Sequence, residues 1–95
     1  MAILSFEDDR LAAIYAGRHP GKGFPADLVR AVQRKLRYIE VAAVLDDLKH
    51  PPGNRLHALK ADRAGQHAIS VNDQFRLCFV WTPAGATQLE FTDYH

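Results

Sequence analysis

The sequence lacks several features that define whole classes of protein. It has one cysteine, Cys78, among 95 residues, so an internal disulfide and a cysteine-ligated zinc site are both excluded. No apolar run approaches the roughly 18 residues that cross a bilayer. The first nine residues carry three acids and no basic residue, unlike a secretory signal. These absences predict a cytoplasmic protein with no membrane partner.

An excess of charge of one sign is also missing. Twelve lysines and arginines against eleven acids leave a net charge of +1, far from the strongly basic balance of many nucleic-acid-binding domains. Residues 49–76 depart from this balance, with five basic and two acidic side chains. That segment either faces phosphates or is an ordinary solvated surface. A chain this short predicts one domain, residues 1–95, with too little volume for a large enclosed cofactor.

The first half of the chain is patterned for helices. Residues 7–16 place apolar side chains at helical spacing, and acids occupy the first turn, where the helix dipole favours them. A glycine-rich loop follows, and Pro25 suits the start of a second helix with an apolar stripe over residues 28–39. Another face of this helix carries three arginines, Arg30, Arg34 and Arg37. They form either a solvated surface or a contact for a partner.

The second half is patterned for an antiparallel sheet. Period-two alternation predicts four strands, at residues 55–59, 67–71, 75–81 and 87–94. Asn72-Asp73 is predicted to form a two-residue hairpin turn, and residues 83–86 the next loop. Helices followed by strands indicate the α+β class.

The length of the last loop predicts a register for the final two strands. With Thr82 opposite Thr87, Arg76 lies opposite Asp93. Because side chains alternate between the faces of a sheet, Arg76, Asp93 and His95 then share one face at the rim of the core. A slip of one residue would separate them.

Three blocks of residues occur in a characteristic order along the chain. They are Arg-Leu-His-Ala-Leu-Lys-Ala-Asp at 55–62, Phe-Arg-Leu-Cys-Phe at 75–79 and Asp-Tyr-His at 93–95. Together with the opening Ile-Leu-Ser-Phe and the chain length, they resemble the HigB-type toxins, the plasmid-maintenance branch of the RelE/ParE superfamily. The resemblance covers essentially the whole chain. It implies a RelE-like α+β fold, a curved antiparallel sheet with the N-terminal helices packed on one face.

The same resemblance implies a function. HigB-type toxins belong to type II toxin–antitoxin systems and are ribosome-dependent endoribonucleases that cleave mRNA in the decoding site. We therefore expect this chain to bind the ribosome and mRNA, to need no metal or cofactor, and to be neutralised by a HigA-like helix-turn-helix antitoxin. The arginines of the second helix are then candidates for contact with acidic antitoxin segments or with ribosomal RNA.

Cleavage of RNA without a metal needs a base for the 2′-hydroxyl, positive charge at the phosphate and an acid for the leaving oxygen. His95 suits proton transfer because imidazole titrates near neutral pH, and it matches the family's terminal histidine. Lys60 and Arg76 match the family's phosphate contacts. Asp93 is expected to orient His95 or the substrate. The expected substrate-binding residues are Tyr94, Arg63 and His67, and either of the last two is a candidate for a further positive charge.

Departures from the family pattern leave alternatives open. Ser70 and Asn72 stand where many relatives carry an arginine, and Phe75 replaces the usual tryptophan. One expected phosphate contact is therefore absent. The chain is alternatively a catalytically weakened binding module, or a ParE-like inhibitor of a protein target such as DNA gyrase. The terminal Asp-Tyr-His favours the nuclease, because a pure binding protein has no chemical use for it.

Overall fold

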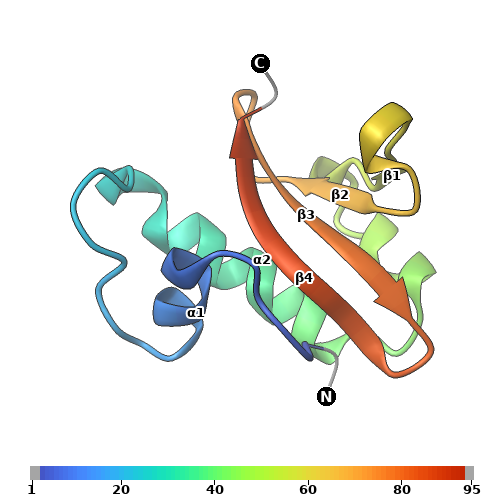
Figure 1. Ribbon diagram of the computed structural model, residues 1–95, viewed down its shortest axis with the longest axis horizontal. Coiled ribbons are helices and arrows are strands. Elements are labelled where there is room, and N and C mark those ends of the chain that lie inside the picture. Colours follow the sequence, from blue (N-terminus) through green and yellow to red (C-terminus); the bar gives the residue numbers. More distant parts are fainter. Residues whose placement is uncertain (1–2, 94–95) are drawn as a thin grey trace.

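The structure, a computed structural model, describes residues 3–93 and folds them as helices packed against one sheet (Figure 1). The helices of the first half are α1 (Asp9–Tyr15), the 3₁₀ turn η1 (Ala26–Leu28) and α2 (Val29–Val41). Three further 3₁₀ turns are η2 (Leu45–Lys49), η3 (Pro52–Asn54) and η4 (Ala61–Arg63). The strands are β1 (His57–Ala58), β2 (His67–Ser70), β3 (Phe75–Thr82) and β4 (Gly85–Asp93). The expected α+β class is confirmed.

α1 forms where the sequence predicts a helix, because Asp8 caps its first turn. The Asp8 carboxylate accepts a hydrogen bond from the Arg10 N–H at 3.0 Å, which satisfies an amide that has no partner within the helix. Leu11 and Ile14, three residues apart, both point into the core. None of the helices in residues 3–93 has the length and apolarity to span a membrane.

α2 buries one stripe of side chains and exposes another. Its apolar stripe of Val32, Leu36 and Ile39 is at most 1% exposed. The predicted arginines of this helix all lie on the exposed side, so they take no part in the core. The helix is therefore amphipathic, with a basic outer surface.

Lys35 is a charged side chain within the buried stripe of α2, only 6% exposed. Its Nζ donates to Asn54 Oδ1 at 2.5 Å. Asn54 Nδ2 in turn donates to two backbone carbonyls, those of Leu48 and His50, both at 3.2 Å. Burial, with a smaller effect from the Arg34 charge, lowers the pKa of Lys35 below its ordinary value. These contacts tie α2 to the segment that leads into β1.

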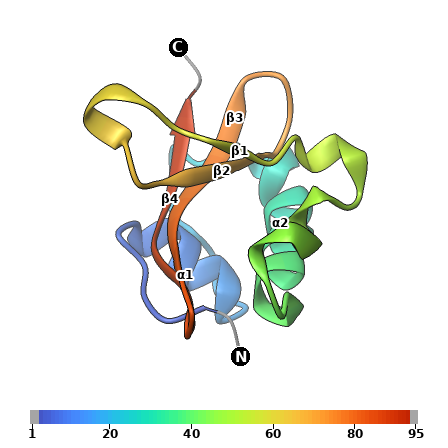
Figure 2. The same cartoon turned by 90° about the vertical axis from the view of Figure 1, so that its right-hand side faces the viewer.

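The four strands form one antiparallel sheet in the order β1-β2-β3-β4, so each strand pairs with its neighbour along the chain. One face of the sheet carries Ile69, Leu77 and Phe91, which share a core with Leu11 of α1 and Leu36 of α2. Both helices therefore pack on the same face, and Figure 2 shows the curved sheet with α2 beside it.

The turn between β2 and β3 differs from the expectation. Four residues, 71–74, connect these strands, so the prediction of a two-residue turn at Asn72-Asp73 is wrong. Asn72 explains the difference, because its Oδ1 accepts hydrogen bonds from the N–H groups of Gln74 and Phe75 at 2.9 and 2.7 Å. In this Asx turn the Asn72 side chain accepts hydrogen bonds from two backbone N–H groups. In a two-residue hairpin, these groups would have to find their partners in the strands.

The predicted register of β3 and β4 is also wrong. Arg76 lies opposite Thr92 and not opposite Asp93. The loop is shorter than expected, because Thr82 pairs with Gly85, and this moves the register by two positions. A shift of two leaves every side chain on its predicted face. A further shift of one position within β4 moves the residues after it, including Asp93, to the opposite face from the one predicted.

A β-bulge at Gln88 causes that second shift. The pairs on either side of it are Cys78 with Glu90 and Val80 with Thr87. β4 thus has one residue more than β3 between these pairs, and Gln88 occupies the extra position with a left-handed φ of 57°. By the alternation of side chains, Asp93 then belongs to the face opposite to that of Arg76.

The N-terminal segment, residues 3–7, runs parallel to β4 along its outer edge. Three backbone hydrogen bonds join them: Leu4 N–H to Ala86 O at 2.8 Å, Glu7 N–H to Leu89 O at 2.9 Å and Leu89 N–H to Ser5 O at 3.2 Å. Ser5 lies at the bulge, where its Oγ accepts a hydrogen bond from the Gln88 N–H at 2.9 Å. The segment therefore covers the edge of the sheet and satisfies an amide at the bulge.

Candidate functional site

The side of the sheet away from the helices forms a distinct surface, which we call the polar face. Cα pairing across the four strands assigns its members: His57, Ala68, Ser70, Arg76, Cys78, Glu90 and Thr92. Ala68, Ser70 and Cys78 of this face are buried but stand outside the main hydrophobic cluster, to which their strand neighbours Ile69, Leu77 and Phe91 belong. The polar and charged side chains of the strands therefore gather on the face opposite to α1 and α2.

Arg63 reaches the polar face from η4. Its Nη1 contacts Glu90 Oε1 at 3.0 Å and donates to Gln66 Oε1 at 3.0 Å, so two side chains hold the guanidinium. The hydrogen bond to Glu90 outweighs burial and raises the pKa of Arg63. Both partners of the ion pair are partly exposed, so its effect is to position Arg63 more than to stabilise the fold.

Arg76 lies beside this ion pair on β3. It is half-buried, opposite Thr92, and two residues before Cys78, whose strand partner is Glu90. Residues two apart on a strand share a face and are separated by about 7 Å. Arg76 and the Arg63–Glu90 pair therefore occupy adjacent positions on the polar face. Cys78 itself is buried, and its Sγ contacts Thr92 Oγ1 at 3.5 Å.

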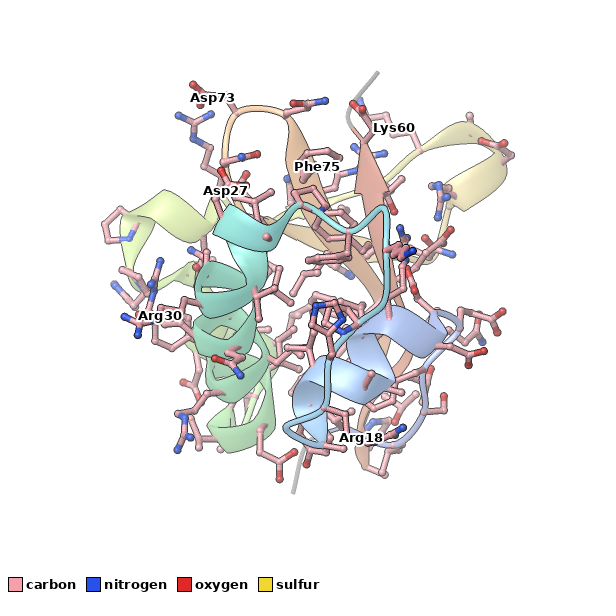
Figure 3. The ribbon with its side chains drawn as sticks, turned by 90° about the vertical axis from the view of Figure 1, so that its left-hand side faces the viewer. Arg18, Asp27, Arg30, Lys60, Asp73 and Phe75 are labelled. Carbon is pink, nitrogen blue, oxygen red and sulfur yellow. The ribbon has the colours of Figure 1, made fainter. Side chains whose placement is uncertain are left out.

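Lys60 is exposed at the start of η4, three residues before Arg63. The next residue, Ala61, has a left-handed φ of 58°, which turns the chain out of β1. Figure 3 shows Lys60 at the end of the molecule toward which β4 runs, and it follows β1, the edge strand opposite to β4. Within residues 3–93 no hydrogen bond or ion pair holds its ammonium group, so the charge is accessible to an anion.

Asp93 occupies a different place from the one that sequence analysis gives it. It is exposed at the end of β4, pairs with Phe75, and accepts a hydrogen bond from Gln74 Nε2 at 3.2 Å. Register thus puts Asp93 and Arg76 on neighbouring strands but on different faces. The other two residues of the terminal motif, Tyr94 and His95, lie outside the described residues.

His67 is a predicted site residue that lies outside this arrangement. It pairs with Phe79 on the core side of β2, and its Nδ1 is buried with no hydrogen-bond partner among residues 3–93. The structure therefore does not bring His67 together with Arg76. Of the two candidates for an additional positive charge, Arg63 is the one that reaches the polar face.

Asp8 and Arg10, which no sequence motif singles out, hold β4 in place. Asp8 accepts a hydrogen bond from the Phe91 N–H at 3.2 Å, and Arg10 donates to both oxygens of its carboxylate at 2.9 and 2.8 Å. The Arg10 guanidinium also lies over the rings of Phe24 and Phe91, at 5.6 and 5.5 Å. Burial alone would raise the pKa of Asp8, but the hydrogen bonds from Arg10 and Phe91 hold it below 3.8.

The part of the chain that the structure describes contains no cluster of three His, Cys, Asp or Glu side chains suited to a metal ion. The charges of the polar face are those of Arg76 and Glu90, together with Arg63, which reaches it from η4. This surface can bind an anion and stabilise negative charge through Arg63 and Arg76, and Lys60 is an exposed cation at the start of the same 3₁₀ turn.

Residues 4–95 match the family described as the RelE-like toxin of the type II toxin–antitoxin system HigB. The chain belongs to the HigB-like toxin family. A toxin of such a system has an antitoxin as its partner. The protein is 36% identical over 78 residues to Toxin HigB-1 of Vibrio cholerae, which is 82% of each chain.

This HigB-like toxin is also similar to a second named relative and to a solved structure. It is 33% identical over 73 residues to Endoribonuclease HigB of Proteus vulgaris, covering 77% of this chain and 78% of that one. Among solved structures, the YoeB/ParE toxin from Agrobacterium tumefaciens superposes with a TM-score of 0.51 at 16% identity, over 97% of this chain and 99% of that one. The last comparison shows that the RelE-like fold expected from sequence is present.

Two departures of this HigB-like toxin from the family pattern have structural explanations. Asn72 forms the turn between β2 and β3 through its side-chain oxygen. Ser70 is 4% exposed and lies directly opposite Arg76, so a longer side chain there would compete with Arg76 for space. The polar face therefore presents Arg63 and Arg76 as its two guanidinium groups.

Proposed function

We propose that this HigB-like toxin is an endoribonuclease that cleaves mRNA on the ribosome, and that a HigA-like helix-turn-helix antitoxin neutralises it. The name of the Proteus vulgaris relative, Endoribonuclease HigB, supports the activity. The observation that carries the proposal is the convergence of Arg63 and Arg76, from different elements, on adjacent positions of the polar face. Two guanidinium groups so placed suit one phosphodiester.

In the proposed reaction, a base takes the proton of the 2′-hydroxyl next to the scissile bond. The freed oxygen attacks the phosphorus atom, the bond from phosphorus to the 5′-oxygen breaks, and an acid gives that oxygen a proton. Negative charge builds on the non-bridging oxygens as the reaction proceeds. Arg76 and Lys60 stabilise this charge in our proposal, with Arg63 as a third contact.

Glu90 positions the Arg63 guanidinium for contact with the phosphate. It holds one edge of the guanidinium through Nη1, which leaves the remaining N–H groups for a phosphate. An arginine already held by a carboxylate and an amide loses little rotamer freedom when it binds a substrate. We therefore assign Glu90 as a positioning residue for Arg63.

His95 is the proposed proton-transfer residue, and Tyr94 and Asp93 are proposed to position the substrate. Imidazole is the side chain best matched to proton transfer near neutral pH. His95 is two residues from Asp93 in the chain, and two residues span at most about 7 Å. That spacing is compatible with proton transfer at a phosphate bound by Arg76. A substrate role for His67 stays a prediction that the geometry of the sheet does not support.

The ribosome has a clear task in this proposal. Few groups of this small surface contact the substrate, and a flexible RNA must be aligned before its 2′-oxygen can attack. The decoding site of the ribosome supplies that alignment. The proposal therefore predicts cleavage of translated mRNA and little cleavage of the same RNA in solution.

The test is an in vitro translation reaction in which mRNA cleavage is followed over time. We expect His95→Ala to lower the cleavage rate by about 10²–10⁴, the usual cost of removing a general acid or base. His19→Ala is the matched control, because His19 is exposed in the loop after α1, away from the polar face. Parental rates for His95→Ala would contradict the proposal. Inhibition of DNA gyrase with intact mRNA would instead favour the ParE-like alternative.

A further inference from the structure

A groove of about 890 Å³ lies between α1 and the exposed side of α2, on the opposite side of the sheet from the polar face. Ile14 and Leu36 form its apolar floor and are 2% and 1% exposed. Tyr15 and Val41 form part of its rim, where they are 47% and 72% exposed. The charged lining residues are Glu40, Arg30, Arg34 and Arg37.

This groove carries positive charge that the protein does not neutralise. Arg30, Arg34 and Arg37 are all exposed, and within residues 3–93 none of them has a hydrogen bond or an ion pair. Figure 3 shows Arg30 extending outward from α2. Glu40, the acid of the groove, instead accepts a hydrogen bond from the Tyr15 hydroxyl at 2.7 Å. The three guanidinium groups are therefore available to a partner.

Two observations favour a protein segment over a nucleic acid as that partner. Exposed apolar side chains, Tyr15 and Val41, stand beside the arginines, and such a combination fits an amphipathic helix. Val41 is also the last residue of α2, so the negative end of the helix dipole and Glu40 lie at that end of the groove. A phosphate backbone carries a charge at every nucleotide and would be repelled at that end of the groove, whereas a bound helix can place an uncharged or basic residue there.

We infer that this groove binds an acidic, amphipathic helical segment of the antitoxin. Its apolar side chains contact Tyr15, Val41 and the floor of the groove, and its carboxylates pair with the arginines. From Arg30 to Arg37 α2 rises by about 10.5 Å, so acids spaced three and four residues apart on the bound helix match them. The inference rests on the proposed function for the identity of the partner.

The test measures binding of the full-length antitoxin encoded beside the toxin gene, by calorimetry, to the full-length toxin. We expect Arg34→Glu to weaken binding at least about tenfold, because it replaces an attractive charge by a repulsive one. Lys22→Glu makes the same charge change on an exposed loop residue outside the groove and should leave the Kd within about twofold.

A second pair of variants tests the apolar contacts of the groove. Val41→Asp alters the groove, whereas Val44→Asp alters an exposed valine outside it. We expect the first to weaken antitoxin binding about tenfold and the second to change it little. Circular dichroism and thermal melting identify any variant that fails to fold, and Arg34→Gln and Val41→Thr then serve as milder replacements.

The results separate this inference from the proposed function. Unchanged antitoxin binding by both Arg34→Glu and Val41→Asp would overturn the inference. Weaker ribosome binding with unchanged antitoxin binding would also overturn it, and would assign the groove to RNA. If the parent protein does not cleave mRNA, the proposed function fails, but the calorimetric comparison still decides where the antitoxin binds. In a nuclease that does cleave, Arg34→Glu should cut at the parental rate and resist neutralisation.

Discussion

Two regions of the molecule present arginines, and they hold them in different ways. On the polar face, Arg63 is fixed by Glu90 and Gln66, and Arg76 is half-buried beside them. In the groove between the helices, Arg30 and its two companions are exposed and have no internal partner among the described residues. Arginines held in one position can stabilise a transition state of defined geometry. Arginines without internal partners can instead adjust to a binding partner, whose side chains order them when the complex forms.

The largest expected difference between the regions is catalytic. Arg76→Ala should lower the rate of mRNA cleavage by about 10²–10³, because it removes a positioned charge from the developing phosphorane. Arg37→Ala, an arginine of the groove, should leave the rate unchanged. Single-turnover cleavage on translating ribosomes measures both. Equal losses for the two variants would show that general positive charge, rather than the polar face, determines activity.

A second test asks whether the fixing of Arg63 matters. Arg63→Lys keeps the charge but cannot hold Glu90 and Gln66 while presenting further N–H groups, so we expect about tenfold slower cleavage. Glu90→Gln should lower the rate by a similar factor, because Arg63 loses the carboxylate that positions it. The effects should not add in the double variant, since both act through one guanidinium. Additive losses would contradict a positioning role for Glu90.

The third expected effect concerns the stability of β4, which carries Glu90 and Thr92 of the polar face. The hydrogen bonds to Asp8 hold its pKa below 3.8, so their contribution is present above that pH and is lost as the pH falls through the lowered pKa. Asp8→Asn should cost about 1–2 kcal/mol of unfolding free energy at pH 7 and less at pH 3, because the amide loses the charge-assisted hydrogen bonds to Arg10. Urea denaturation at the two pH values measures this. A cost independent of pH would show that the carboxylate charge is not involved.

The smallest expected effect is that of salt on the groove. Exposed arginines are screened by ions, so antitoxin binding should weaken about threefold between 0.1 and 0.5 M salt. Arg34→Gln should reduce this dependence. Binding that is insensitive to salt would indicate that Tyr15 and Val41 supply most of the affinity.

The sequence predicts the helices and the core well, because both follow from periodic patterns. The apolar stripe of α2 and the alternation in β3 each place side chains by local spacing alone. The composition of the polar face depends on which residues of β4 pair with β3. The bulge residue Gln88 sets this pairing. Gln88 has no sequence signal for a left-handed conformation, since glycine or asparagine is the usual choice there.

The bulge explains the errors in the predicted site. Without it, Asp93 shares a face with Arg76, and Glu90 lies on the core side, away from Arg63. With it, Glu90 becomes the partner of Arg63, and Asp93 moves to the other face. The role of Ser5 in satisfying the bulge joins positions 83 residues apart, which no local pattern reveals.

The pairing of residues 3–7 with β4 has a consequence for how the toxin is made. Residues 3–7 are synthesised long before their hydrogen-bonding partners in β4, Ala86 and Leu89. This edge of the sheet cannot form until β4 has left the ribosome, because its contacts join residues about 80 positions apart. A product of interrupted synthesis that stops before β4 therefore lacks the strand that holds residues 3–7.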